Sequence, residues 1–142
     1  MYKNILIPLD NSPSDQAIID HIQLFAKLFG ASVIIVHVAD GYVARLQDQL
    51  NLADSEEIKD DERYLEKRRK ELEKAGLKVR TFLVQGEPAD EILALAKREG
   101  CDLIAMATHG HKFVKDLIFG SVADNIRHRT DIPILMIRST AK

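Results

Sequence analysis

Short apolar runs alternate along the chain with longer amphipathic segments, and this order leaves few folds open. Most of the runs are continuously apolar and rich in Val and Ile, which is typical of strands covered on both faces in a parallel sheet. The run over residues 79–84 mixes polar with apolar side chains, which indicates a strand at the edge of the sheet. The five runs span residues 4–9, 32–38, 79–84, 103–107 and 134–137.

The segments between the runs carry apolar residues at helical spacing, and three of them stop at a glycine, as helices commonly do. Every crossover is long enough for a parallel connection. The alternation therefore predicts one α/β domain over residues 1–142, a doubly wound, open five-stranded parallel sheet with helices on both faces. The expected helices span residues 14–29, 55–75, 89–99 and 121–129, whereas residues 39–54 fit either a short helix or a mobile insertion.

Composition excludes several classes of partner. The formal net charge is −2, from 20 basic and 22 acidic residues, which gives no field to hold a nucleic acid or an acidic membrane. The basic residues 67–70 are interleaved with glutamates and predict a solvated helix face. No apolar stretch approaches the ~20 residues of a membrane span.

The single cysteine and the start of the chain indicate a cytoplasmic protein. Cys101 rules out an intrachain disulfide, which favours a reducing compartment. The chain enters a strand-like run at once, without the pattern of a signal peptide. Cys101 precedes a buried strand with no partner base evident, so we expect a small inert side chain rather than a nucleophile.

The strand order predicts where a ligand would bind. In open α/β sheets, ligands lie beyond the carboxyl ends of the strands where the strand order reverses, and here we expect the reversal between the first and fourth strands. The residues to inspect therefore follow Ile7 and Met106. Gly120 and Ser121 open the last expected helix, whose free N–H groups and dipole favour an anion, although many helices begin with Gly-Ser and bind nothing.

At these residues the sequence resembles the nucleotide-binding members of the universal stress protein family. Their motif is a glycine, two residues, a glycine, nine residues, and a glycine followed by Ser or Thr. Ala107, Gly110, Gly120 and Ser121 reproduce this spacing, with Ala107 in place of the first glycine. The first-strand exit, Pro8 to Ser12, also matches the family pattern, and the similarity covers nearly the whole chain apart from residues 40–60.

The resemblance implies a Rossmann-like fold of the adenine nucleotide alpha hydrolase type that binds ATP or AMP, with Mg²⁺ as a companion of ATP. Asp10 would hydrogen-bond the adenine or ribose end, Val38 would contact adenine, and Met106 would line the ribose region. His109 and Gly110 would begin the phosphate loop. The implied nucleotide-binding residues are Pro8, Leu9, Asp10, Val38, Met106, Ala107, His109, Gly110, Lys112, Gly120, Ser121 and Val122.

Ala107 leaves two explanations open for the missing glycine. Its methyl group would crowd the ribose if the family glycine serves close approach. If the position needs a positive φ, alanine strains the backbone by an amount on the order of 1 kcal/mol. In either case we expect nucleotide binding to be weakened but retained.

Structural interpretations stand beside the functional ones. Asp10 could be only a residue near the N-terminus of the first helix, stabilised by the helix dipole. Ser12 fits an N-cap of the same helix better than a ligand contact. His21 and His37 lie on apolar patterns and are expected to be packed. His109 and His111 lack a third candidate ligand, so we predict no metal site.

The competing functions come from different classes. A regulatory nucleotide-binding module with at most slow ATP hydrolysis competes with a dimeric interaction module that has lost its ligand. A phosphate-accepting receiver domain is excluded, because Asp10 has no acidic partner after the first strand and Val84 and Gln85 stand where an aspartate is needed. Conventional turnover is disfavoured, because no arginine lies near the loop to clamp a γ-phosphate.

The last strand predicts self-association. Residues 132–137 are apolar up to Arg138, whereas exposed edge strands are normally protected by charge. The simplest cover is the same strand of a second copy, paired antiparallel about a two-fold axis. The family resemblance also implies a homodimer, and we expect its interface to centre on Ile134 and Met136.

Overall fold

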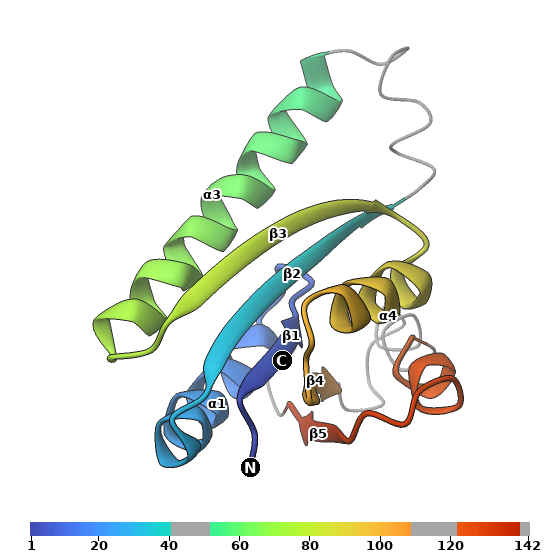
Figure 1. The fold of residues 1–142 in the computed structure, drawn as a ribbon. Helices are drawn as coiled ribbons and strands as arrows, with labels where there is room; N and C mark the ends of the chain where they lie inside the picture. Colours follow the sequence, from blue (N-terminus) through green and yellow to red (C-terminus); the bar gives the residue numbers. More distant parts are fainter. Residues whose placement is uncertain (41–51, 109–121, 140–142) are drawn as a thin grey trace.

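The computed structural model describes residues 1–40, 52–108 and 122–139, and this part of the chain forms one five-stranded parallel sheet in the order β3-β2-β1-β4-β5 (Figure 1). The predicted α/β fold is confirmed, and β3 and β5 are the edge strands. The strands are β1 (Asn4–Pro8), β2 (Ser32–Asp40), β3 (Val79–Gly86), β4 (Leu103–Thr108) and β5 (Ile134–Arg138). The helices are α1 (Asp15–Phe29), α3 (Leu52–Lys74) and α4 (Pro88–Arg98), with a further helix over residues 122–127.

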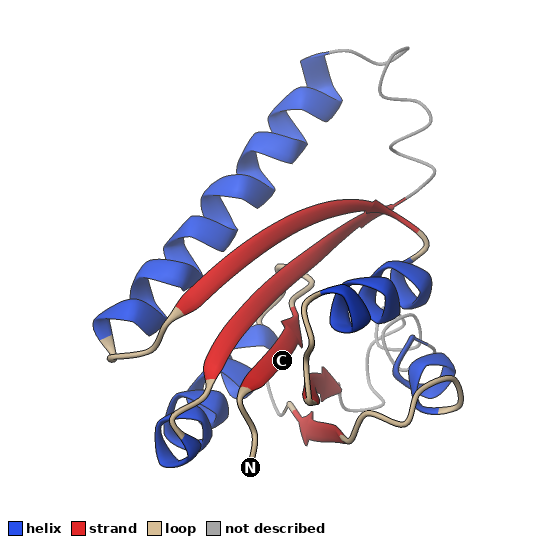
Figure 2. Ribbon diagram, in the orientation of Figure 1, coloured by secondary structure: helices blue, strands red, loops and turns tan. Residues whose placement is uncertain are grey.

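The helices cover both faces of the sheet (Figure 2). Side chains of one strand point alternately to the two faces, so Ile5 and Ile7 of β1 pack against α1 and α3, while Leu6 packs against α4 and the helix over residues 122–127. Both faces of the sheet are thus buried, which explains the continuously apolar strands. No helix in these described ranges combines the length and apolar character of a membrane span.

Local sequence accounts for the ends of α1 and α4. Gly30 ends α1 with a left-handed φ of 65°, a conformation that costs glycine little. Glu87 caps α4, because its carboxylate accepts the Asp90 N–H at 2.8 Å and Pro88 occupies the first turn, where no N–H partner is needed.

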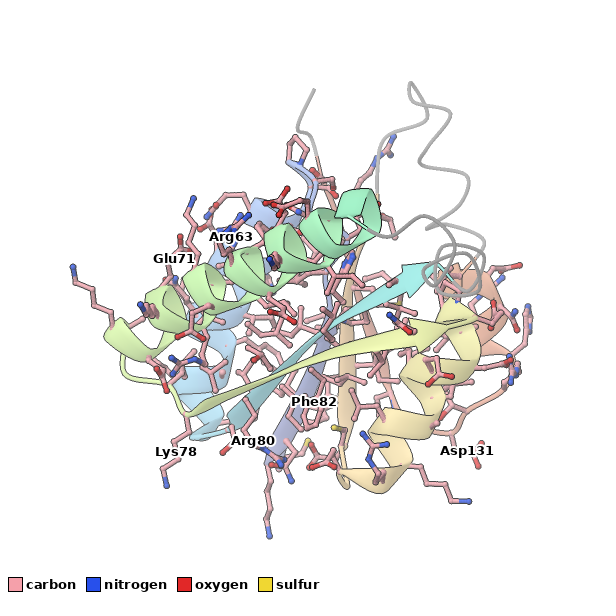
Figure 3. The ribbon with its side chains drawn as sticks, turned by 90° about the horizontal axis from the view of Figure 1, so that it is seen from above. Arg63, Glu71, Lys78, Arg80, Phe82 and Asp131 are labelled. Carbon is pink, nitrogen blue, oxygen red and sulfur yellow. The ribbon has the colours of Figure 1, made fainter. Side chains whose placement is uncertain are left out.

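Helix α3 packs along β3 and β2 although most of its residues are charged (Figure 3). Leu65 and Leu72 are buried against the sheet, as their spacing predicted. The expected solvated basic face is only partly confirmed, because Arg68 is 8% exposed and turns inward. In the uncertain stretch 39–54, residues 39 and 40 belong to β2 and residues 52–54 belong to α3. Residues 41–51 lie outside the described part.

The strand order reverses between β1 and β4, as predicted. β1 pairs with β2 through Pro8 and Val36, and with β4 through Leu6 and Ile104. The carboxyl ends of β1 and β4 therefore flank the switch point, which is the expected ligand position in an open α/β sheet.

Candidate functional site

The predicted site residues divide between described and undescribed parts of the chain. Pro8 ends β1, and Leu9 and Asp10 follow it; Val38 lies near the end of β2, Met106 and Ala107 near the end of β4, and Val122 in the last helix. His109, Gly110, Lys112, Gly120 and Ser121 lie outside the described residues. The phosphate loop implied by the motif thus stays a prediction.

Three predicted residues lie on the same face of the sheet. Val38, Met106 and Val122 belong to the apolar cluster beneath α4, although they come from three distant parts of the sequence. Leu9 and Ala107 point to the opposite face and pack with α1 and α3. Met106 and Val122 are buried in this core, at 0% and 7% exposed, and of the three side chains only Val38 is partly exposed.

The structure tests one of the two explanations for Ala107. The residue lies in a strand, it is 1% exposed and its methyl group packs in the core. Among the described residues that are not glycine, a positive φ occurs at Asn11 and not at Ala107. The substitution therefore causes no left-handed strain, whereas the effect of its buried methyl group on a ligand stays a prediction.

The loop after β1 is organised by a buried carboxylate that the sequence analysis missed. Asp15, the first residue of α1, is 1% exposed. Its carboxylate accepts the N–H of Asp10 at 3.2 Å, of Asn11 at 2.9 Å and of Ser12 at 3.4 Å. These bonds hold the backbone that carries Asp10.

The prediction that Ser12 is the N-cap of α1 is wrong. The N-cap is Ser14, which has α-helical backbone angles and makes no side-chain capping bond. The Ser12 hydroxyl instead donates to Asp10 Oδ1 at 2.5 Å and lies 2.7 Å from the Ser14 hydroxyl. Asp10 is therefore held by side-chain and backbone contacts within its own loop.

The pKa of Asp15 is raised to about 6, first because burial disfavours the charged form and next because the Asp10 carboxylate is close. A hydrogen bond from Tyr64 opposes this rise: the Tyr64 hydroxyl on α3 donates to Asp15 Oδ2 at 2.5 Å. Burial, followed by the charge of Asp15, also raises the pKa of Tyr64, so the phenol keeps its proton.

Arg68 supports Tyr64 one helical turn further along α3. Its Nε donates to the Tyr64 hydroxyl oxygen at 3.1 Å. One terminal nitrogen donates to Gln16 Oε1 at 2.8 Å and to Glu71 Oε2 at 2.9 Å. The buried guanidinium thus joins α3 to the first turn of α1.

A second connection runs from β2 to α3. His37 Nδ1 donates to the Leu9 carbonyl at 2.8 Å, and its Nε2 lies 3.2 Å from Asp61 Oδ2, with both side chains 14% exposed. Asn11 Nδ2 also donates to Asp61 Oδ1 at 3.4 Å. His37 is packed as predicted, whereas His21 is exposed on α1.

A signal for the missed residues is present in the sequence. Asp61, Tyr64 and Arg68 follow one another at helical spacing, next to the buried Leu65. They went unrecognised because the charged residues of this helix were expected to lie on a solvated face. Asp15 follows Ser12 by three residues, at the start of the first expected helix.

Metal binding and thiol chemistry find no further support in the described residues. Over residues 1–40, 52–108 and 122–139, no group of three or more His, Cys, Asp and Glu side chains is placed to hold a metal ion. Cys101 is buried, and burial, with a smaller effect of the Glu99 charge, raises its thiol pKa to about 11. The thiol therefore stays protonated at neutral pH and is unsuited to nucleophilic attack.

Comparison with known proteins assigns the chain to a family. The sequence model of the universal stress protein family matches residues 1–138. Universal stress protein MJ0577 of Methanocaldococcus jannaschii is 31% identical over 97% of this chain and 96% of its own length, and MJ0531 of the same organism is 32% identical over 100% and 85%.

Solved structures agree with this assignment. The structure of MJ0577 superposes with a TM-score of 0.85, covering 100% of this chain and 99% of the other. A universal stress protein from Archaeoglobus fulgidus, solved in complex with dAMP, shares the fold at 21% identity, with a TM-score of 0.71 and coverage of 96% and 98%. From the family match and from the identity to MJ0577 and MJ0531, the chain belongs to the universal stress protein family.

Proposed function

We propose that the protein binds an adenine nucleotide, ATP or AMP, as a regulatory ligand at the switch point between β1 and β4. The observation that carries this proposal is the ordered loop at the end of β1. A buried carboxylate fixes its backbone, and Asp10 lies at the position where the family motif expects contact with adenine or ribose. A loop held in one conformation loses less entropy when it binds.

Val38, partly buried near the end of β2, supports the same ligand, because an adenine ring needs an apolar surface beside its polar edge. The A. fulgidus relative, solved with dAMP, shows that this fold accommodates an adenine nucleotide in another protein. The motif residues Gly110, Gly120 and Ser121 are proposed to hold the phosphates. Mg²⁺ is proposed only as a companion of ATP, whose phosphate oxygens suit a hard cation.

The proposed role is regulatory, in a stress response, with at most slow ATP hydrolysis. Hydrolysis needs a group that orients water and charges that clamp the γ-phosphate. Asp10 is engaged with Ser12, and the motif segment itself, residues 107–121, contains no arginine. The alternative of a ligand-free interaction module gains nothing from Ala107, because its methyl group lies in the core.

The same proposal places the protein in the cytoplasm as a homodimer joined through β5. The strand lies at the edge of the sheet, and Met136 is 47% exposed there. Antiparallel pairing with a second copy would cover both this edge of the sheet and the Met136 side chain.

Calorimetric titration of ligand-stripped protein with ATP and with AMP tests the function. We expect a dissociation constant in the micromolar range or weaker, about 10⁻⁶ to 10⁻⁴ M, together with a thermal shift. Gly120→Val should remove phosphate binding while the fold persists, because glycine in the motif allows the backbone to approach a phosphate. No heat and no thermal shift with either nucleotide would contradict the proposal.

A further inference from the structure

Two side chains of α3 restrain the loop after β1. The Tyr64 hydroxyl donates to Asp15, whose carboxylate in turn accepts the N–H groups of Asp10, Asn11 and Ser12. Asp61 contacts His37, which donates to the Leu9 carbonyl. Both connections end on the backbone of residues 9–12, the segment that carries Asp10.

Contacts from outside the loop hold its backbone. Asn11 has a φ of 60°, in the left-handed region that asparagine adopts more readily than most residues other than glycine. Its Nδ2 contacts Asp61 on α3, and its N–H contacts Asp15. Loss of these contacts would release the loop into a broader set of conformations, of which only some would present Asp10 to a ligand.

We propose that Tyr64 and Asp61 are positioning residues that set the affinity of the site for its nucleotide and couple α3 to it. They act through Asp15 and His37 rather than by touching the ligand. The inference rests on the proposed function, because the affinity in question is that for an adenine nucleotide. It adds that ligand binding at the site and the packing of α3 affect each other.

The charges around Asp15 give this role a pH dependence. The groups facing it are Asp10 from the loop and Tyr64 from α3, with Arg68 behind Tyr64. Protonation of Asp15 removes the charge that attracts the three N–H groups of the loop, so affinity should fall in acid. The Tyr64 hydrogen bond favours the ionised carboxylate, and without it the same fall should occur at a higher pH.

The test compares Tyr64→Phe with Tyr2→Phe, which removes a hydroxyl from the aromatic cluster around Phe25 and Phe29. Calorimetric titrations with AMP run from about pH 5 to 8. We expect Tyr64→Phe to weaken binding about fivefold to tenfold near neutral pH and to move the midpoint of the pH profile upward. Tyr2→Phe should change neither the affinity nor the midpoint of the pH profile. The titration of AMP itself affects wild type and both variants equally.

Asp61→Asn, with the exposed Glu62→Gln as its control, provides a second variant should Tyr64→Phe fold poorly. We expect weaker binding for Asp61→Asn and faster amide exchange at residues 9–12 in both α3 variants without ligand. Wild-type protein that binds no nucleotide would refute the proposed function, whatever the variants do. If the wild type binds and folded Tyr64→Phe and Asp61→Asn keep its affinity and its pH midpoint, the positioning role is wrong.

Discussion

Asn4 and Asp102 bind each other reciprocally at the amino end of the sheet: the Asp102 N–H donates to the Asn4 carbonyl at 2.9 Å, and the Asn4 N–H donates to Asp102 Oδ1 at 3.0 Å. The carboxylate also accepts the Lys3 N–H, at 2.9 Å for Oδ2. β1 and β4 are the strands that flank the switch point. Their relative register is therefore fixed at the end opposite to the site.

Asp102→Ala should lower the free energy of unfolding by about 1–2 kcal/mol, because it removes a carboxylate that accepts hydrogen bonds from two backbone N–H groups. Urea denaturation measures the change. Asp131→Ala, at an exposed position (Figure 3), should stay within about 0.5 kcal/mol of wild type. Equal losses in the two variants would show that the Asp102 contacts do not stabilise the fold.

The raised pKa of Asp15 predicts how stability depends on pH. The folded protein holds the Asp15 proton more tightly than the unfolded chain does. The stability contributed by this group is therefore complete below about pH 4 and is lost as pH rises through about 6. Asp15→Asn should remove this loss, so its stability relative to wild type should increase between about pH 4 and 7, by an amount on the order of 2 kcal/mol.

Urea denaturation at several pH values checks the Asp15 prediction, and the difference between variant and wild type cancels the titration of carboxylates that do not interact with Asp15. Asp20→Asn, on the exposed side of the same helix, is the matched control and should give a flat difference. A flat difference for Asp15→Asn as well would mean that Asp15 titrates as an ordinary carboxylate.

The fold could be predicted from sequence because the determining pattern is local. Continuously apolar runs between amphipathic segments allow few arrangements other than a parallel sheet covered on both faces. The structure confirms the strand order and the two edges. The prediction of solvation failed for Arg68, because a long side chain can turn inward when tertiary contacts satisfy its donors.

The candidate site was less accessible to the same reasoning. A motif identifies residues that meet a ligand, but it says nothing of the groups behind them. Tyr64 reaches Asp15 across 49 sequence positions, and His37 reaches Leu9 across 28. Such contacts depend on how α3 packs on the sheet. The motif likewise left two explanations open for Ala107, and the structure, which shows its backbone angles and its burial, excludes only the positive φ.

Ala107→Gly should therefore destabilise the fold without improving the site. The change removes a buried methyl group and places a flexible residue in a strand, which together cost on the order of 1 kcal/mol. We expect nucleotide affinity within about twofold of wild type. Denaturation and calorimetric titration on the same preparation check both parts. Tighter binding with unchanged stability would restore the view that the methyl group crowds the ligand.

The final prediction concerns the pairing of two copies through β5. Within the described ranges the strand pairs with β4 and lies at the edge of the sheet, and Met136 is 47% exposed on it. Met136→Glu would place a charge in an apolar interface and leave it without a partner, which costs more than the lost contact alone. We expect wild-type protein to sediment as a dimer at micromolar concentration and Met136→Glu as a monomer or aggregate. Gln85→Glu, on the opposite edge strand, should remain dimeric, so a wild-type monomer or a dimeric Met136→Glu would refute pairing through β5.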